Sequence, residues 1–285
     1  MKPILLFLSL LCAAFCYSQD TNDDYSAIIE DSKPLQHLLS LFTIHGVPKN
    51  QNQDDSLTIL INHGYCIGFS KKNNQPLWVA YQVSKAKKDV DYERFPFFVD
   101  DRRLPEANQI GSQTFGGGFD LGHMAPNAAI NRQFGKMSQM ETFLMSNICP
   151  QKAGLNQGVW QKLEAAILNT YCNTVKDTTH VWVLVGPILS DNPEFITREN
   201  GTKVAIPDSF YCILARPFRY PYDRPGNAQY LPFIFSQNLL KTQPLNKSFL
   251  VNINRIEERT GINFFPNFTV NNQATIETKT PTALW

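Results

Sequence analysis

The stretch "DLGHMAP", from Asp120 to Pro126, holds a single histidine, His123, between an aspartate and a run of small residues. An imidazole has an unperturbed pKa of about 6.5. At neutral pH it can therefore take a proton from water as a general base. A lone histidine beside glycine also occurs as a buried structural residue or as a metal ligand, so this stretch alone leaves three roles open for His123.

A second group of polar residues follows in "LNQGVWQKLE", where Asn156 and Glu164 are eight residues apart and Trp160 lies between them. On one helix these residues share a face, and Glu164 leans back toward Asn156 because side chains point toward the helix N-terminus. An amide oxygen, a carboxylate and waters suit hydrated Mg²⁺, with Mn²⁺ as a substitute, better than Zn²⁺. The competing interpretation is that Asn156 caps the helix and Glu164 is solvated.

The elements that must position these residues follow from the apolar patterns. Two β-rich runs, 57–70 and 76–85, are joined by the polar turn "KKNNQ" and predict a hairpin. Strands and helices interleave without a clean βαβ rhythm, which favours an α+β fold. The predicted helices are 33–42, 136–143, 157–172 and a short one stopped by Gly261, and the further predicted strands are 144–148, 180–189, 203–216 and 231–240.

The composition is that of one globular domain: 285 residues, 43% of them hydrophobic. Residues 1–18 read as a signal peptide, with a basic start, a short apolar run and small residues after it. We therefore expect a secreted or periplasmic protein without stable membrane association, in which 19–56 form an N-terminal arm and 57–285 the domain. The sequence does not fix an oligomeric state.

The net charge and the cysteine count say less about the function than the polar motifs do. Removing 1–18 takes away Lys2 and no acidic residue, so the formal charge falls from +1 to 0 and gives no support to a nucleic-acid partner. A local basic face could still hold phosphates. Four cysteines remain, an even number that in an exported protein predicts disulfides with three possible pairings; buried free thiols are the alternative. They are Cys66, Cys149, Cys172 and Cys212.

Taken together, these motifs resemble the DNA/RNA non-specific endonuclease family, which includes secreted bacterial nucleases and mitochondrial endonuclease G. The family's Asp-Arg-Gly-His motif falls on 120–123, its second motif on 146–151 and its third on 155–164. The nine-residue spacing from Asn147 to Asn156 is kept. The resemblance covers about 57–268 and implies a ββα-metal nuclease core on a mixed, mostly antiparallel central sheet flanked by helices.

The resemblance also implies the role of each site residue. His123 would be the general base that activates water for in-line attack on a backbone phosphorus. Asn156 would be the direct protein ligand of a hydrated Mg²⁺, and Glu164 would hold a metal-bound water. Asn147 would position the site, and Asp120 would help to fix the strand end that presents His123.

Two arginines of the family pattern are absent. The motif arginine is Leu121 here, and the position one helical turn after Glu164 is Leu168. Arg94 is the best match to the upstream arginine that grips phosphate in the family, and Arg102 is the alternative. We expect weaker phosphate binding together with an intact hydrolytic core.

The sequence therefore predicts a secreted, metal-dependent endonuclease that hydrolyses DNA and RNA through contacts to the phosphate backbone. Such contacts carry no base information, so sequence specificity should be low. One alternative is a catalytically weakened or inactive nucleic-acid-binding protein on the same fold, with Leu121 as a sign of decay. Another is a secreted structural or adhesion domain held together by disulfides.

Overall fold

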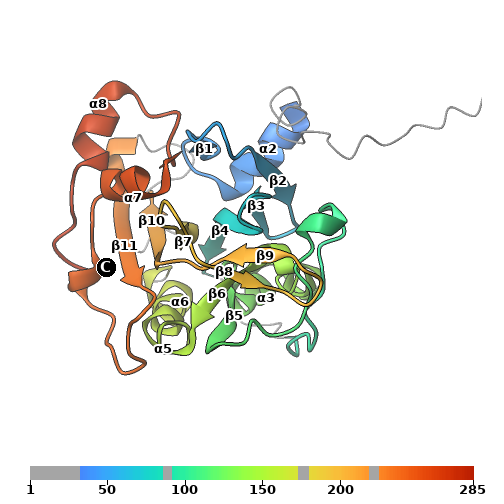
Figure 1. The fold of residues 1–285 in the computed structure, drawn as a ribbon. Coiled ribbons are helices and arrows are strands. Elements are labelled where there is room, and N and C mark those ends of the chain that lie inside the picture. The colour runs from blue at the N-terminus through green and yellow to red at the C-terminus, as the bar shows by residue number, and fades with distance from the viewer. Residues whose placement is uncertain (1–32, 86–91, 173–179, 218–224) are drawn as a thin grey trace, which may run out of the picture.

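A six-stranded antiparallel sheet forms the centre of the molecule in the computed structural model, which describes residues 33–85, 92–172, 180–217 and 225–285 (Figure 1). The predicted signal peptide, 1–18, lies outside the described residues. Neighbouring strands are antiparallel throughout this sheet. In spatial order they are β11 (Gln229–Ser236), β10 (Ser209–Arg216), β7 (His180–Ile188), β4 (Gln75–Ser84), β3 (Tyr65–Ser70) and β2 (Leu57–Ile61).

Both faces of the sheet are buried, which explains why its central strands read as continuous apolar runs. Along β7 and β10, alternate side chains enter two separate cores, as the pleat requires. One core contains Val183 and Cys212, and the other contains Trp182 and Tyr211. The predicted hairpin is confirmed, because β3 and β4 pair directly and β2 extends the same meander.

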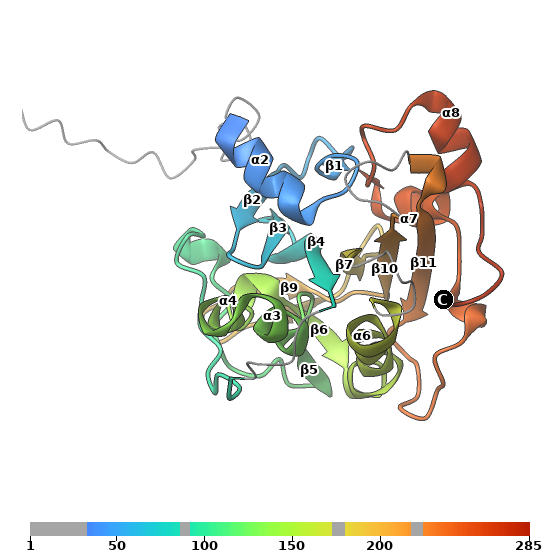
Figure 2. The same ribbon diagram turned by 180° about the vertical axis from the view of Figure 1, so that it is seen from behind.

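The two faces are covered by different helices (Figures 1 and 2). α2 (Lys33–Phe42), which has the predicted bounds, and α7 (Ile253–Thr260) cover one face. α7 ends at Gly261, as predicted, with the glycine at φ 68°. The opposite face carries α3 (Asn127–Phe134), α4 (Lys136–Glu141) and the helix that follows β6.

Small elements complete the fold. β5 (Phe119–His123) pairs with β6 (Ile148–Lys152), and β8 (Phe195–Thr197) pairs with β9 (Lys203–Ala205). β1 (Lys49–Asn50) pairs with β12 (Ile262–Asn263), and α8 (Val270–Asn272) lies near the C-terminus. Through α2 and β1, the segment expected to form an arm packs against the sheet.

Three predicted elements differ from the structure. The predicted strand 144–148 is wrong: Met145–Asn147 form a 3-10 turn, and the strand is β6. Residues 203–216 form two strands because Pro207, which has no N–H, falls between β9 and β10. The single helix predicted for 157–172 begins earlier, with α5 (Ala153–Leu155), and continues through α6 (Gln161–Ala166).

The predicted disulfides are corrected by the structure. All four cysteines of the predicted mature chain are buried as free thiols. They lie on separate elements of the packed interior, where burial raises the pKa of each thiol. Buried thiols pack as small apolar side chains, which matches the alternative interpretation.

Candidate active site

β5 and β6 form a short ribbon that carries the first two motifs beside the start of the third (Figure 2). In its register Asp120 lies opposite Gln151, and His123 lies opposite Ile148. Three successive glycines with positive φ, 116–118, turn the chain into β5. His123 is the last residue of β5, and the chain then enters α3 through Pro126.

Asp120 connects the ribbon to the helix of the third motif. Its Oδ2 accepts hydrogen bonds from Asn156 Nδ2 at 2.8 Å and from Gln157 Nε2 at 2.9 Å. Asn156 has helical backbone angles and its side chain caps no helix end, so the capping interpretation is wrong. Because the Asn156 amino group is held by Asp120, its amide oxygen is directed away from that carboxylate.

His123 lies in an aromatic environment. Its ring centroid is 5.4 Å from that of Phe98 and 5.1 Å from that of Phe143. Burial, and secondarily the charge of Arg94, lower the pKa of His123 to about 3. Within the described ranges, its buried Nε2 has no hydrogen-bond partner. The imidazole is therefore neutral at pH 7, which is the form that a general base needs.

Arg94 is the arginine that the structure brings to this group. Its Cζ lies 4.9 Å from the centroid of the Phe143 ring, which also contacts His123. The charge of Arg94 lowers the pKa of both His123 and Glu164, so the guanidinium lies within electrostatic reach of both. Arg102 is exposed, and no such influence on His123 or Glu164 comes from it.

Glu164 is the second carboxylate of the group. Burial raises its pKa to about 8, against the smaller lowering effects of the Trp160 indole and Arg94. A nearby cation would favour the ionised form of this partly buried carboxyl group.

The donor set fits a hard, hydrated cation. It consists of the Asn156 amide oxygen and the Glu164 carboxylate, both of them oxygen donors, as Mg²⁺ prefers. Among the described residues, no three His, Cys, Asp or Glu side chains gather closely enough to hold a metal ion. The residues present therefore suit Mg²⁺ with several waters rather than Zn²⁺ with three or four protein ligands.

Asn147 is fully buried, and its side-chain amide forms hydrogen bonds with backbone atoms. Its Oδ1 accepts from Ala125 N at 2.8 Å, and its Nδ2 donates to the carbonyl oxygens of Ala125 at 3.0 Å and Thr142 at 2.9 Å. These bonds hold the chain two residues after His123. The side-chain amide of Asn147 is therefore fully used in fixing this loop.

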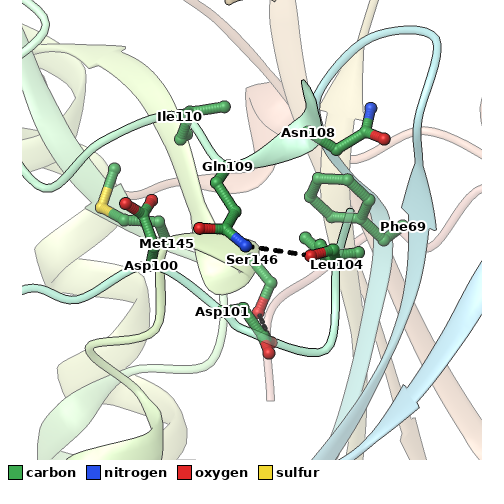
Figure 3. Close-up of a pocket in the computed structure, with 9 residues that line it drawn as sticks. All are labelled: Phe69, Asp100, Asp101, Leu104, Asn108, Gln109, Ile110, Met145 and Ser146. Atoms are coloured by element: carbon green, nitrogen blue, oxygen red, sulfur yellow. Dashed lines mark hydrogen bonds between the residues drawn. The ribbon is translucent and has the colours of Figure 1, made fainter. Parts of the chain in front are cut away.

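Ser146 and Asp101 belong to a neighbouring structural network (Figure 3). Ser146 Oγ donates to Asp101 Oδ2 at 2.6 Å, and Arg103 pairs with the same carboxylate. Although burial alone raises the pKa of Asp101, the bonds from Arg103 and Ser146 lower it below the usual value. The adjoining hollow beside Leu104 has no room for a water molecule, so this network supports the fold and is not a ligand site.

Sequence reasoning missed two side chains of the site. Gln157 had no assigned role, yet it shares the Asp120 carboxylate with Asn156. Gln151 is buried against Gly122, and neither atom of its amide has a hydrogen-bond partner in the described part of the chain. The third motif placed Gln157 beside Asn156, but only the position of β5 shows which acceptor it binds.

Comparisons with known proteins agree with this arrangement. The model of the DNA/RNA non-specific endonuclease family matches residues 45–271. The human mitochondrial nuclease EXOG is 28% identical over 218 residues, covering 71% of this chain and 55% of that protein. A nuclease of Nostoc sp. is 26% identical over 264 residues, covering 86% and 89%. The chain thus spans about half the length of the EXOG relatives that it matches.

A solved structure has the same fold. The crystal structure of an EndoG/EndoGI complex matches with a TM-score of 0.64 and 19% sequence identity, covering 88% of this chain and 98% of that one. At this level of identity the match concerns the fold. It confirms the α+β class and the ββα-metal architecture expected from the sequence.

Proposed function

Because the chain belongs to the DNA/RNA non-specific endonuclease family, we propose that it is a metal-dependent endonuclease that hydrolyses phosphodiester bonds of DNA and RNA. The observation that carries this proposal is the bond from Asn156 to Asp120, which joins the third motif to the strand that presents His123. This bond supports a site in which a base, an oriented amide oxygen and a carboxylate act together, as phosphodiester hydrolysis requires.

Asn156 and Glu164 would hold Mg²⁺, the amide oxygen directly and the carboxylate through a bound water. When bound, Mg²⁺ stabilises the negative charge that develops on the phosphate and on the leaving 3′ oxygen. Asp120 keeps the Asn156 oxygen in the orientation that this contact needs.

His123 would take the proton of the attacking water at a ring nitrogen. Its aromatic surroundings and the Arg94 charge keep it neutral, so the base form is present at pH 7. Arg94 would bind the scissile phosphate, and that anion would offset the arginine charge and raise the pKa of His123 toward a more effective value. Asn147 holds the chain after His123 in place.

The proposal also covers the sequence specificity of cleavage and the location of the protein. Phosphates and sugars carry no sequence information, so cleavage should be nearly independent of sequence. We propose a secreted or periplasmic location from the signal peptide at 1–18, and a nuclease domain at 57–285. In the described ranges, no helix has the length and apolar character needed to span a bilayer.

A second function, a nucleic-acid-binding protein with weakened catalysis, is favoured by one observation. Leu121 and Leu168 are both half-buried against apolar clusters, so the two family cations are replaced by packing side chains. This function predicts binding without turnover.

One experiment separates the two functions. Purified full-length protein is incubated with supercoiled plasmid and with RNA, with Mg²⁺ and with EDTA, beside His123→Ala. We expect nicking that requires the metal and is lost in the variant. Binding without cleavage in Mg²⁺, Mn²⁺ and Ca²⁺ would support the second function, and wild-type rates in His123→Ala would refute the mechanism.

A further inference from the structure

The segment that follows β11 returns to the candidate site. Gln237, at its start, accepts a hydrogen bond from Lys152 N at 2.8 Å. Its amide donates to the carbonyl oxygens of Pro150 at 2.9 Å and Pro207 at 3.2 Å. The 237–241 segment is thereby fixed to β6, the strand that pairs with the strand carrying Asp120 and His123.

Gly154, just before the third motif, and Gly158, within it, allow this segment to pack against the helix. A Cβ on Gly154 would lie 2.3 Å from the carbonyl oxygen of Leu239, and a Cβ on Gly158 would lie 2.9 Å from Lys241 Cα. Gly158 also leaves the helical conformation, at φ −110° and ψ −113°. Any side chain here would push the segment away, so the two glycines set the position of the Lys241 backbone relative to the helix.

Lys241 is joined to the site through one amide. Its Nζ donates to Gln157 Oε1 at 3.1 Å, and Gln157 Nε2 donates to Asp120 Oδ2 at 2.9 Å. The same carboxylate oxygen holds Asn156. The ammonium is therefore separated from the proposed Mg²⁺ ligand by a single shared carboxylate and one glutamine, and its side chain is exposed to solvent.

Two other lysines lie beside it. Lys152 Nζ donates to Asn238 Oδ1 at 2.5 Å, within the same segment. Lys162 Nζ donates to the Gln243 carbonyl at 2.9 Å. In the parts of the chain that the structure describes, none of these three ammonium groups forms an ion pair. Exposed cations without acidic partners attract a polyanion.

We propose that Lys241 binds a backbone phosphate adjacent to the scissile one, supported by the charges of Lys152 and Lys162. Lys241 would supply a positive charge, which Leu121 and Leu168 cannot. It would favour a polynucleotide substrate that extends beyond the reacting phosphate. This inference rests on the proposed nuclease function. It makes polynucleotides, rather than small phosphodiesters, the preferred substrates.

Salt-dependent binding tests the role of Lys241 directly. Fluorescence anisotropy measures the affinity for a labelled single-stranded oligonucleotide in His123→Ala protein, with and without Lys241→Gln. Loss of one phosphate contact reduces the slope of log K against log salt by about 0.7. The affinity difference between parent and variant should therefore shrink about threefold between roughly 50 and roughly 200 mM salt.

The matched control is Lys49→Gln, an exposed lysine on β1, which packs against the opposite face of the sheet. It should leave the slope unchanged, and Lys241→Arg should restore it. In the active protein, Lys241→Gln should raise KM for the oligonucleotide several-fold, a much larger effect than its effect on KM or on the rate for bis(p-nitrophenyl) phosphate. Unaltered melting temperatures would show that the variants are folded.

The outcomes distinguish the two proposals. If the wild-type protein neither binds nor cleaves polynucleotides, the nuclease function fails. If it does both, but Lys241→Gln keeps the parent slope and KM, the phosphate contact at Lys241 is refuted. Equal losses on the oligonucleotide and on the small diester would also refute it, since they would show a structural effect on the site.

Discussion

The two faces of β5 have different surroundings, one polar and one apolar. Asp120 lies on the side that meets the third-motif helix and binds two amides there. Phe119 and Leu121 lie on the other side and pack against an apolar cluster that includes Ile148. Because alternate residues of a strand point to opposite faces, Asp120 faces the helix while Leu121 faces the apolar cluster. His123, two residues after Leu121, shares the face of Leu121 and contacts Phe98 of that cluster.

This contrast explains how the site can lose a family cation without losing its hydrolytic residues. The pleat separates Leu121 from Asp120, so an apolar residue at 121 leaves the bonds of Asp120 intact. The cations near the site come from other segments, Arg94 from the loop before η1 (Glu106–Asn108) and Lys241 from the segment after β11. The residues proposed to bind phosphate therefore come from separate segments of the chain, whereas those proposed for proton transfer and metal binding come from three consecutive motifs.

The strongest test of the proposed hydrolytic residues is His123→Ala. Loss of a general base lowers the rate by about 10²–10⁴-fold, and we expect a loss in this range with oligonucleotide affinity nearly unchanged. Plasmid nicking gives the rate, and anisotropy gives the affinity. A parallel Leu121→Ala variant changes a packing side chain on the same face of β5 and should lose far less activity. Equal losses in the two variants would show that the loss at His123 comes from disturbed packing and not from a missing base.

Asp120→Asn should produce the next largest effect, because it weakens the acceptor that orients Asn156. Removing a group that orients a metal ligand costs about 10–100-fold in metal affinity or activity. Titrating activity against Mg²⁺ measures this loss. Gln157→Ala removes only the neighbouring bond to Asp120 and should shift the Mg²⁺ midpoint less. If the Mg²⁺ midpoint is unchanged in Asp120→Asn, Asp120 does not orient Asn156 for metal binding.

Two buried histidines on opposite sides of the sheet predict the pH dependence of stability. Burial lowers the pKa of His45 to about 4, and burial with the Arg94 charge lowers that of His123 to about 3. Each must stay neutral in the folded state, while the unfolded chain binds protons below about pH 6.5. Stability present above pH 6.5 should therefore be lost progressively as the pH falls toward 4.

Denaturant unfolding at several pH values measures this loss. His45→Asn, at a position with φ 61° that asparagine tolerates, should flatten the curve between pH 6.5 and 4. His37→Asn is the control, since the His37 side chain is exposed on α2. If stability falls with pH as steeply in His45→Asn as in the wild type, the protonation of His45 does not contribute to the pH dependence of folding.

Leu121→Arg should have the smallest effect on function. The new guanidinium would improve oligonucleotide affinity a few-fold at raised salt if it reaches phosphate. Because the arginine side chain would leave the apolar cluster, the free energy of unfolding should fall by about 0.5–3 kcal/mol, as for other disrupted packing. Leu121→Met keeps the apolar contact and serves as the control. An unchanged salt dependence would show that position 121 does not meet phosphate.

Local patterns predicted much of the fold. The hairpin, the helix at 33–42 and the end of α7 at Gly261 depend on residue periodicity and on backbone preferences, which neighbouring residues determine. The errors arose where tertiary bonds override those preferences. At Asn147 the buried amide binds the Ala125 and Thr142 backbone, and a turn forms where a strand was predicted.

By itself, the sequence determined the order and spacing of the three motifs, and thus the family and the candidates His123, Asn156 and Glu164. Only the tertiary structure decided which groups meet. Arg94 and Lys241 approach the site across long stretches of chain, and the cysteines remain apart as buried thiols. Spacing along a chain fixes which residues share a strand or helix, but contacts between distant segments depend on how their faces pack.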